Sequence, residues 1–223
     1  MSRLTIAKQL AETTLAIGAF KLRPEDPFRW ASGYYMPIYN DNRMLLGNAS
    51  HRRLVSDGFA ALIEENQLAF DVVCGTATAG IAPATTLADR LAKPLVYVRD
   101  KAKGHGMQNR VEGILNDGQT CLVIEDVIST GGSSVSAVEG VRESGGVVNT
   151  CLSIYNFGFP KAEKLFSEAN CKLLSVLDFG ILLETAVQLG KLTNSAETEL
   201  RAWYENPFVW GISRGYPSPE PKN

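Results

Sequence analysis

Short apolar runs alternate with amphipathic segments from residue 70 to residue 189, and this alternation restricts the possible folds more than any other feature. The predicted strands are 70–74, 95–99, 120–125, 147–155 and 172–177. The predicted helices are 81–91, 133–144, 161–169 and 180–189. Alternation of this kind is typical of a parallel sheet, and strands that are apolar throughout require helices on both faces. We therefore expect an α/β fold with a central parallel sheet flanked by helices.

The region before this alternation adds helices and a hairpin. Residues 4–17 and 48–65 have apolar side chains at helical spacing, and residues 28–39 place two aromatic-rich runs around Ser32 and Gly33. We expect residues 20–45 to form a small hood region beside a core of about residues 66–180. Residues 215–223, which include three prolines, should form a flexible tail. At roughly 150 residues per domain, a chain of 223 residues is expected to be one domain, 1–223.

Composition excludes several classes of protein. The net charge of -2 lacks the basic excess that nucleic-acid binding requires. No apolar stretch approaches the roughly 20 residues that a membrane span needs, and the N-terminus does not resemble a secretory signal. The four cysteines are far apart and lie in or beside apolar runs, so we expect them to be buried. The chain is expected to be cytoplasmic and to bind neither nucleic acid nor membranes.

The strongest motif joins the predicted strand 120–125 to the helix that follows. Glu125 and Asp126 precede a turn whose residues are small or carry hydroxyls, namely Ser129, Thr130, Gly131, Gly132 and Ser133. At the carboxyl end of a parallel strand, such a turn points backbone N–H groups and the positive end of a helix at one ligand, which favours a phosphate. The carboxylates suit a diol or water-mediated Mg²⁺. Together they indicate a sugar phosphate; an ordinary Ser/Thr helix cap is the alternative.

A second candidate region is the stretch 100–119, which has four glycines and too little periodicity for a helix or a strand. Its beginning is basic, because residues 99–110 contain four Lys or Arg and one Asp, a charge of +3. Long irregular segments inside compact domains are usually functional or disordered. The local positive charge indicates an anionic ligand.

Residues 124–134 resemble the phosphoribosyl pyrophosphate (PRPP) motif of the type I phosphoribosyltransferase family. Residues 99–106 resemble the mobile catalytic loop of its orotate-specific members, whose pattern is Arg-x-x-x-Lys-x-His-Gly. The resemblance extends from about residue 20 to residue 189. It implies the type I phosphoribosyltransferase fold with an N-terminal hood. It also implies transfer of the phosphoribosyl group from PRPP to N1 of orotate, with Mg²⁺, in pyrimidine (UMP) biosynthesis.

The resemblance also assigns residues to roles. Lys103, His105 and Asp126 are the expected catalytic residues. The residues expected to bind PRPP are Arg99, Lys101, Lys103, His105, Glu125, Asp126, Val127, Ile128, Ser129, Thr130, Gly131, Gly132 and Ser133. Glu125 and Asp126 are also expected to contact the metal through water. Thr78 and Ala79 lie in a turn that resembles the pyrophosphate loop, although spacing alone equally fits an ordinary strand-to-helix turn with Thr as its cap. Ser129 lies where the family contacts orotate.

This sequence departs from the family pattern at several positions where other members have a positively charged residue. Asp100, Ala31 and Ala79 stand where many members have Lys, and Asn156 lies where others have Arg for orotate. The orotate carboxylate therefore needs another partner. Arg43 is the hypothesis made here, because it directly follows the hairpin region, and Tyr39 is a candidate for stacking on the base.

Members of the family are homodimers in which the catalytic loop acts across subunits, and we expect the same here. Two alternatives remain. One is another type I phosphoribosyltransferase that acts on a purine base, which would lack the orotate-type loop pattern. The other is a non-catalytic PRPP-sensing regulator, which should carry a basic face or a helix-turn-helix extension.

Overall fold

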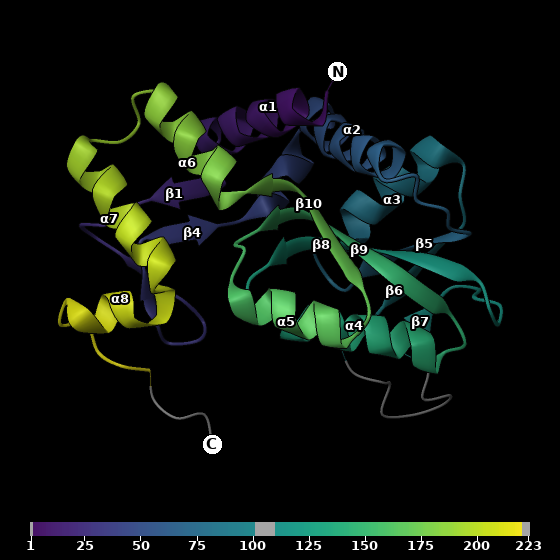
Figure 1. The fold of residues 1–223 in the computed structure, drawn as a ribbon. Helices are drawn as coiled ribbons and strands as arrows, with labels where there is room; N and C mark the ends of the chain where they lie inside the picture. The colour runs from purple at the N-terminus through teal and green to yellow at the C-terminus, as the bar shows by residue number, and fades with distance from the viewer. Residues whose placement is uncertain (1, 101–109, 220–223) are drawn as a thin grey trace.

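The computed structural model describes residues 2–100 and 110–219. Its centre is a six-stranded sheet in the order β10-β9-β8-β5-β6-β7 (Figure 1). The strands are β5 (Val72–Thr76), β6 (Leu95–Val98), β7 (Val111–Glu112), β8 (Thr120–Ile128), β9 (Val147–Asn156) and β10 (Lys172–Asp178). All neighbouring strands are parallel except β6 and β7, which are antiparallel. The expected central parallel sheet is confirmed.

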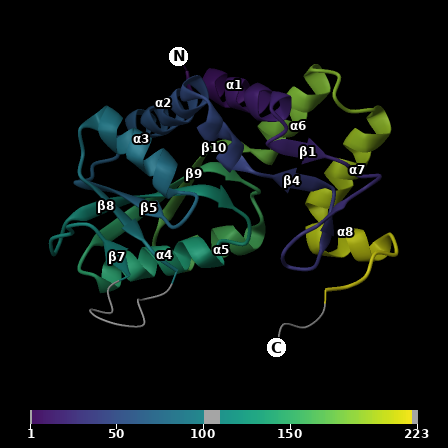
Figure 2. The ribbon, with the colours of Figure 1, turned by 180° about the vertical axis from the view of Figure 1, so that it is seen from behind.

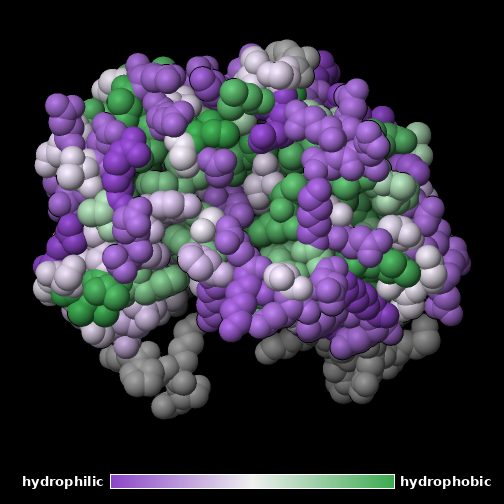
Figure 3. Space-filling view, in the orientation of Figure 1, coloured by the Kyte–Doolittle hydropathy of each residue, from purple (hydrophilic) through white to green (hydrophobic). Residues whose placement is uncertain are grey.

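Helices cover both faces of the sheet, as the apolar strands required (Figures 1 and 2). On one side lie α1 (Arg3–Ala16), α2 (Ala49–Glu65), α3 (Ile81–Leu91) and α6 (Phe179–Gln188). On the other side lie α4 (Gly132–Glu143) and α5 (Pro160–Glu168), whose outer surface is largely hydrophilic (Figure 3). The predicted helices differ from these at their ends by one residue at most.

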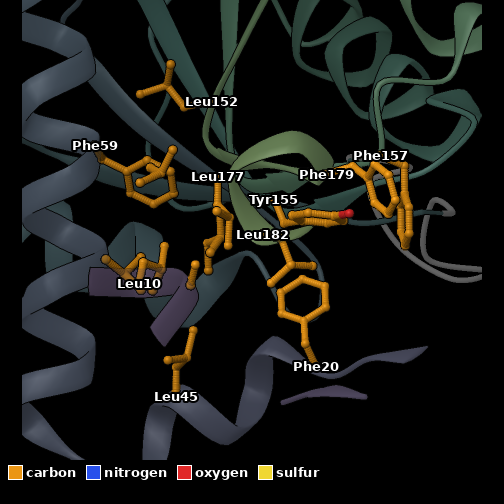
Figure 4. Packing of buried hydrophobic residues seen from close by; sticks show 14 of the residues in the cluster. Leu10, Phe20, Leu45, Phe59, Leu152, Tyr155, Phe157, Leu177, Phe179 and Leu182 are labelled. Carbon is orange, nitrogen blue, oxygen red and sulfur yellow. The ribbon is translucent and has the colours of Figure 1, made fainter. Parts of the chain in front are cut away.

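Two apolar clusters hold these layers together. The larger lies between the sheet and the first group of helices, where Leu10 and Phe59 lie near Leu152, Tyr155 and Leu177 (Figure 4). The smaller lies beneath α4 and α5 and includes Cys74, Cys121, Cys151 and Cys171. All four cysteines are free and buried, as expected.

The hood consists of two small antiparallel sheets. One pairs β1 (Phe20–Leu22) with β4 (Ile38–Asn40), and the other pairs β2 (Phe28–Arg29) with β3 (Tyr35–Met36). The expected hairpin over residues 28–39 is therefore present, although its strands are shorter than the aromatic runs. A 3₁₀ helix, η1 (Asn42–Gly47), joins the hood to α2.

Two C-terminal helices that the sequence patterns did not reveal, α7 (Asn194–Glu205) and α8 (Pro207–Ser213), complete the hood. Trp203 of α7 is fully buried, and its indole N–H lies 3.2 Å from the Met36 sulfur. Tyr216 stacks on Tyr35 with 4.8 Å between ring centroids. The first residues of the expected tail therefore lie against the hood, while residues 220–223 are outside the described residues.

Residues 100–119 were expected to form neither helix nor strand, and this is wrong at one point. Val111 and Glu112 form β7, because their backbone pairs with the free edge of β6. A two-residue strand is too short to show a periodic pattern.

None of the helices in the described residues has the length and the apolar character of a membrane-spanning segment.

Candidate active site

The motif after β8 forms a sharp turn into α4. β8 continues to Ile128, three residues beyond its predicted end. Gly131 is the N-cap of α4 and has a φ of +81°, a conformation that side chains disfavour. A Cβ on Gly131 would lie 3.1 Å from the Cα of Ala162, so the turn also packs closely on α5.

No side chain within the described residues forms a capping hydrogen bond at the start of α4, so the ordinary Ser/Thr cap is not present. The first N–H groups of a helix have no partners within the helix, and their positive end attracts anions. Among the described residues, the hydroxyls of Ser129, Thr130 and Ser133 make no hydrogen bond. The turn therefore offers backbone and hydroxyl donors to one anion, as a phosphate requires.

Glu125 points into the protein and not towards this turn. Its side chain is 9% exposed and accepts hydrogen bonds from the Thr76 hydroxyl at 2.7 Å and the Ser134 hydroxyl at 2.9 Å. Its Oε1 also accepts from the Asp126 N–H at 3.0 Å. Burial, and secondly the Asp126 side chain, raise the pKa of Glu125 to about 7. Glu125 thus links β5, β8 and α4, a role that the sequence motif did not reveal.

Asp126 is the more accessible acid of the pair. Burial raises its pKa as well. Its backbone carbonyl accepts a hydrogen bond of 2.8 Å from the buried Asn42 side chain, which ties η1 to the end of β8. The described residues contain no group of three or more His, Cys, Asp or Glu placed to hold a metal. The Asp126 carboxylate offers oxygen ligands of the kind that Mg²⁺ prefers, and Mg²⁺ usually keeps several of its water ligands.

The turn 77–80 lies at the same edge of the sheet, because β5 is the parallel neighbour of β8. Gly80 is the N-cap of α3, and no side chain of the described chain caps this helix, so the alternative of a Thr cap is wrong. A Cβ on Gly80 would lie 2.5 Å from the Ile124 carbonyl oxygen, so glycine is needed for this approach. Thr78 is exposed and Ala79 half-buried, and the Ala77–Thr78 peptide bond is cis.

The turn of residues 129–133, called the phosphate turn below after its proposed ligand, lies beside a cleft of about 380 Å³ between the sheet and the hood. Its lining is Arg29, Trp30, Ala31, Ser32, Tyr39, Asn40, Val127, Ser129, Thr130, Phe157 and Phe208. The centroids of the Trp30 and Phe157 rings are 5.2 Å apart, and the indole N–H of Trp30 donates to the Ile38 carbonyl at 2.8 Å. The cleft therefore combines aromatic walls with the hydroxyls of the phosphate turn, which suits a flat ring attached to a phosphorylated sugar.

The structure separates two of the three candidate orotate contacts, Tyr39 and Arg43, while Ser129 lines the same cleft as Tyr39. Tyr39 lines the aromatic cleft, whereas Arg43 lines a separate cavity of about 20 Å³ together with Asn42, Ala79 and Asp126. The Arg43 guanidinium donates to both carboxylate oxygens of Asp41, at 2.6 and 3.0 Å. This hydrogen bonding lowers the pKa of Asp41.

Arg99 lies at the base of the basic segment. Its N–H donates to the Arg110 carbonyl at 2.9 Å, and the Arg110 Nε donates back to the Arg99 carbonyl at 3.1 Å. Arg99 also contacts Glu112 at 3.4 Å, and Arg110 lies over Gly140 of α4, where a Cβ would be 2.8 Å from its guanidinium carbon. Lys101, Lys103 and His105 lie outside the described residues.

The sequence patterns did not reveal the hydrogen-bond partners of Glu125 or two of the residues that line the cleft. Thr76 and Ser134 hold Glu125, while Arg29 and Phe208 line the cleft. Ser134 was within reach of the sequence, since it ends the PRPP-like motif. Phe208 carried no signal, because it is brought to the cleft by a helix about 80 residues away along the chain.

Comparison with known proteins agrees with this geometry. The Phosphoribosyl transferase domain matches residues 49–178. An orotate phosphoribosyltransferase of Listeria innocua is 46% identical over 208 residues, which cover 93% of this chain and 100% of the relative. The crystal structure of orotate phosphoribosyltransferase from Aeropyrum pernix is 34% identical, with a TM-score of 0.71 and coverage of 82% and 99%.

A structure of the Mycobacterium tuberculosis orotate phosphoribosyltransferase in complex with PRPP has the same fold. Its TM-score is 0.63 at 24% identity, and the match covers 79% of this chain and 98% of that one. The identity and coverage of the first two relatives decide the family. This chain belongs to the orotate phosphoribosyltransferase family.

Proposed function

We propose that the protein transfers the 5-phosphoribosyl group from PRPP to N1 of orotate, giving orotidine 5′-phosphate and pyrophosphate, a step of UMP biosynthesis. The observation that carries this proposal is the uncapped turn of residues 129–131 opening beside an aromatic cleft. The turn suits the 5-phosphate, and the adjoining cleft suits a planar base. The match to relatives named orotate phosphoribosyltransferase over more than nine-tenths of the chain supports orotate as the base.

The residues at this edge of the sheet suit each part of PRPP. Ser129, Thr130, Gly131, Gly132 and Ser133 would bind the 5-phosphate through backbone and hydroxyl donors. Val127 and Ile128 would contribute backbone at the end of β8. Asp126 would accept hydrogen bonds from the ribose hydroxyls. Glu125, whose oxygens already have partners, would hold these elements in place.

Catalysis must favour the separation of ribose from pyrophosphate. The transferred ribosyl group develops positive charge, while negative charge accumulates on the departing pyrophosphate. By family resemblance, Lys103, His105, Lys101 and Arg99 would stabilise that negative charge. The backbone of residues 77–80, with Thr78 and Ala79, would hold the pyrophosphate near the start of α3. The aromatic walls of the cleft would keep water from the reacting carbon.

Mg²⁺ is part of this proposal. When bound to PRPP it would neutralise charge on the pyrophosphate, and Asp126 would contact it through water. Glu125 would contribute less than expected from the sequence, because its carboxyl is engaged within the protein. The cytoplasmic location expected from the sequence stays a prediction.

The direct test supplies PRPP and Mg²⁺ with orotate, uracil, adenine or hypoxanthine separately and measures pyrophosphate release. We expect release with orotate. Release with a purine but not with orotate would establish the purine-specific alternative. PRPP binding without turnover of any base would establish the regulator.

We further propose that the protein is a homodimer in which the catalytic loop of one subunit serves the site of the other. The family resemblance supports this. A mixture of Lys103→Ala subunits and Asp126→Asn subunits should regain activity. One site of each mixed dimer would combine the intact Lys103 of one subunit with the intact Asp126 of the other. The homodimeric variants serve as controls, and a mixture as inactive as these controls would contradict sharing.

A further inference from the structure

We propose that Arg29 binds the carboxylate of orotate and so determines the preference of this enzyme for orotate over uracil. The inference rests on the proposed function, because it assigns the aromatic cleft to the base. Orotate differs from uracil only by a carboxylate on the ring. A site that selects orotate therefore needs a cation, or several donors, at the edge of the base pocket.

The composition of the cleft points to this residue. Of its lining residues that the structure describes, four are aromatic, namely Trp30, Tyr39, Phe157 and Phe208, and Arg29 is the one with a positive charge. A flat, apolar ring surface meets the aromatic walls, while an anionic substituent needs the cation. No acidic residue is among the described lining residues, so Arg29 has no competing anion there.

The local structure leaves the Arg29 side chain available. Arg29 is the last residue of β2, and its backbone is paired with Tyr35 of β3. Its side chain is exposed, and within the described residues it makes no hydrogen bond or ion pair. The backbone is thus fixed by the hairpin, while no described residue takes up the donors of the guanidinium. A guanidinium presents these donors as a planar fork that matches a carboxylate with two parallel hydrogen bonds.

The alternative cation, Arg43, is less suited to this role. Asp41 occupies its guanidinium through two hydrogen bonds, and Arg43 lines the cavity beside Ala79 and Asp126 and not the aromatic cleft. Binding orotate there would require the Asp41 pair to open. These contacts favour Arg29 over Arg43 as the partner of the carboxylate.

The loss of a charge-assisted pair fixes the expected size of the effect. Hydrogen bonds to charged groups contribute amounts that correspond to about 10- to 100-fold in affinity. Arg29→Gln should raise KM for orotate by about this factor and leave KM for PRPP within about twofold. Arg29→Lys should recover part of the loss, because it keeps the charge but not the fork.

The control variant is Arg23→Gln. Arg23 lies in the same hood region, is paired with Asp26 and is not among the described residues that line the cleft. Its KM for orotate should equal that of the wild type. Arg43→Gln is measured in parallel. If Arg43→Gln raises KM for orotate 10-fold or more while Arg29→Gln does not change it, the proposal is overturned in favour of Arg43.

A binding measurement separates this inference from the proposed function. Orotidine 5′-phosphate and UMP differ only by the carboxylate, and their dissociation constants can be measured by titration calorimetry without turnover. Arg29→Gln should weaken binding of orotidine 5′-phosphate about 10- to 100-fold and leave UMP unchanged. Equal weakening of both nucleotides, or of neither, would overturn the role of Arg29. If the wild type binds both nucleotides but turns over no base, the proposed function fails independently.

Discussion

Replacing Glu125 with glutamine should remove a loss of stability that the wild-type protein suffers as pH rises. The Glu125 carboxyl is almost fully buried, and its pKa is raised from 4.5 to about 7, chiefly by burial. The folded state therefore keeps a proton that the unfolded chain has released between pH 4.5 and 7. Since folding takes up a proton in this range, the free energy of unfolding decreases as pH rises through it.

The size of this effect follows from the two pKa values. Raising a pKa from 4.5 to about 7 corresponds to about 3 kcal/mol of stability that is present below pH 4.5 and lost above pH 7. Glutamine has the shape of the protonated acid. Its carbonyl can accept from Thr76 and the Asp126 N–H, and its amide can donate to the Ser134 hydroxyl. The variant keeps the contacts without the titration.

Urea unfolding, followed by circular dichroism at pH 5, 6, 7 and 8 without substrates, measures the difference. Between pH 5 and pH 8 the free energy of unfolding of Glu125→Gln should rise by about 2–3 kcal/mol relative to the wild type. Glu184→Gln, which changes an exposed carboxyl on α6, should run parallel to the wild type. If Glu125→Gln also runs parallel, the buried carboxyl is not the group that titrates, and the reasoning is refuted.

Three further substitutions test the packing around the site. Trp203→Ala should lower the free energy of unfolding by about 3–5 kcal/mol in chemical denaturation, because Trp203 is fully buried at the centre of the aromatic cluster. Gly58→Ala should destabilise the protein by about 1–3 kcal/mol, since its Cβ would lie 2.5 Å from Val176, and Val176→Ala added to it should restore part of this loss in thermal melts. Phe208→Ala should raise KM for orotate about 10-fold with KM for PRPP unchanged, and Phe208→Leu should have a smaller effect; equal effects on both substrates would show that Phe208 acts on the whole site.

Local sequence patterns predicted the strands and helices of the core, because hydrophobic periodicity is set by residues that are close together in the sequence. Apolar strands followed by amphipathic helices leave few arrangements other than a parallel sheet covered on both faces. The turn from Ser129 to Gly131 was also predictable, since a positive φ at its end requires a glycine. Alternation along a strand required the Glu125 and Asp126 side chains to diverge, but local patterns could not supply which of the two turns inward. Glu125 turns inward to Thr76 and Ser134, while Asp126 stays accessible, although the two are neighbours.

The C-terminal region, in contrast, contains two helices, α7 and α8, that were not predicted from the sequence, although Ala196, Leu200 and Trp203 of α7 are buried at helical spacing. Local spacing did not reveal that Trp203 packs on Phe157 and Phe179, at the ends of distant strands. The contribution of these two helices to the base cleft depends on packing between segments that are far apart in sequence. The proposed orotate contact differs from the sequence-based hypothesis for the same reason. Arg43 is close to the hairpin along the chain, but the fold places it in a different cavity from Tyr39.

The alternation of strands and helices and the residues of the phosphate turn were determined by the sequence itself. Each depends on periodicity, glycine conformations and hydrogen-bond donors within a few neighbouring residues. The tertiary structure decided which cations and rings line the cleft and which acid is buried. These choices depend on how the hood and the C-terminal helices pack on the edge of the sheet, where burial sets the pKa of Glu125 and the packing brings Arg29 and Phe208 to one cleft.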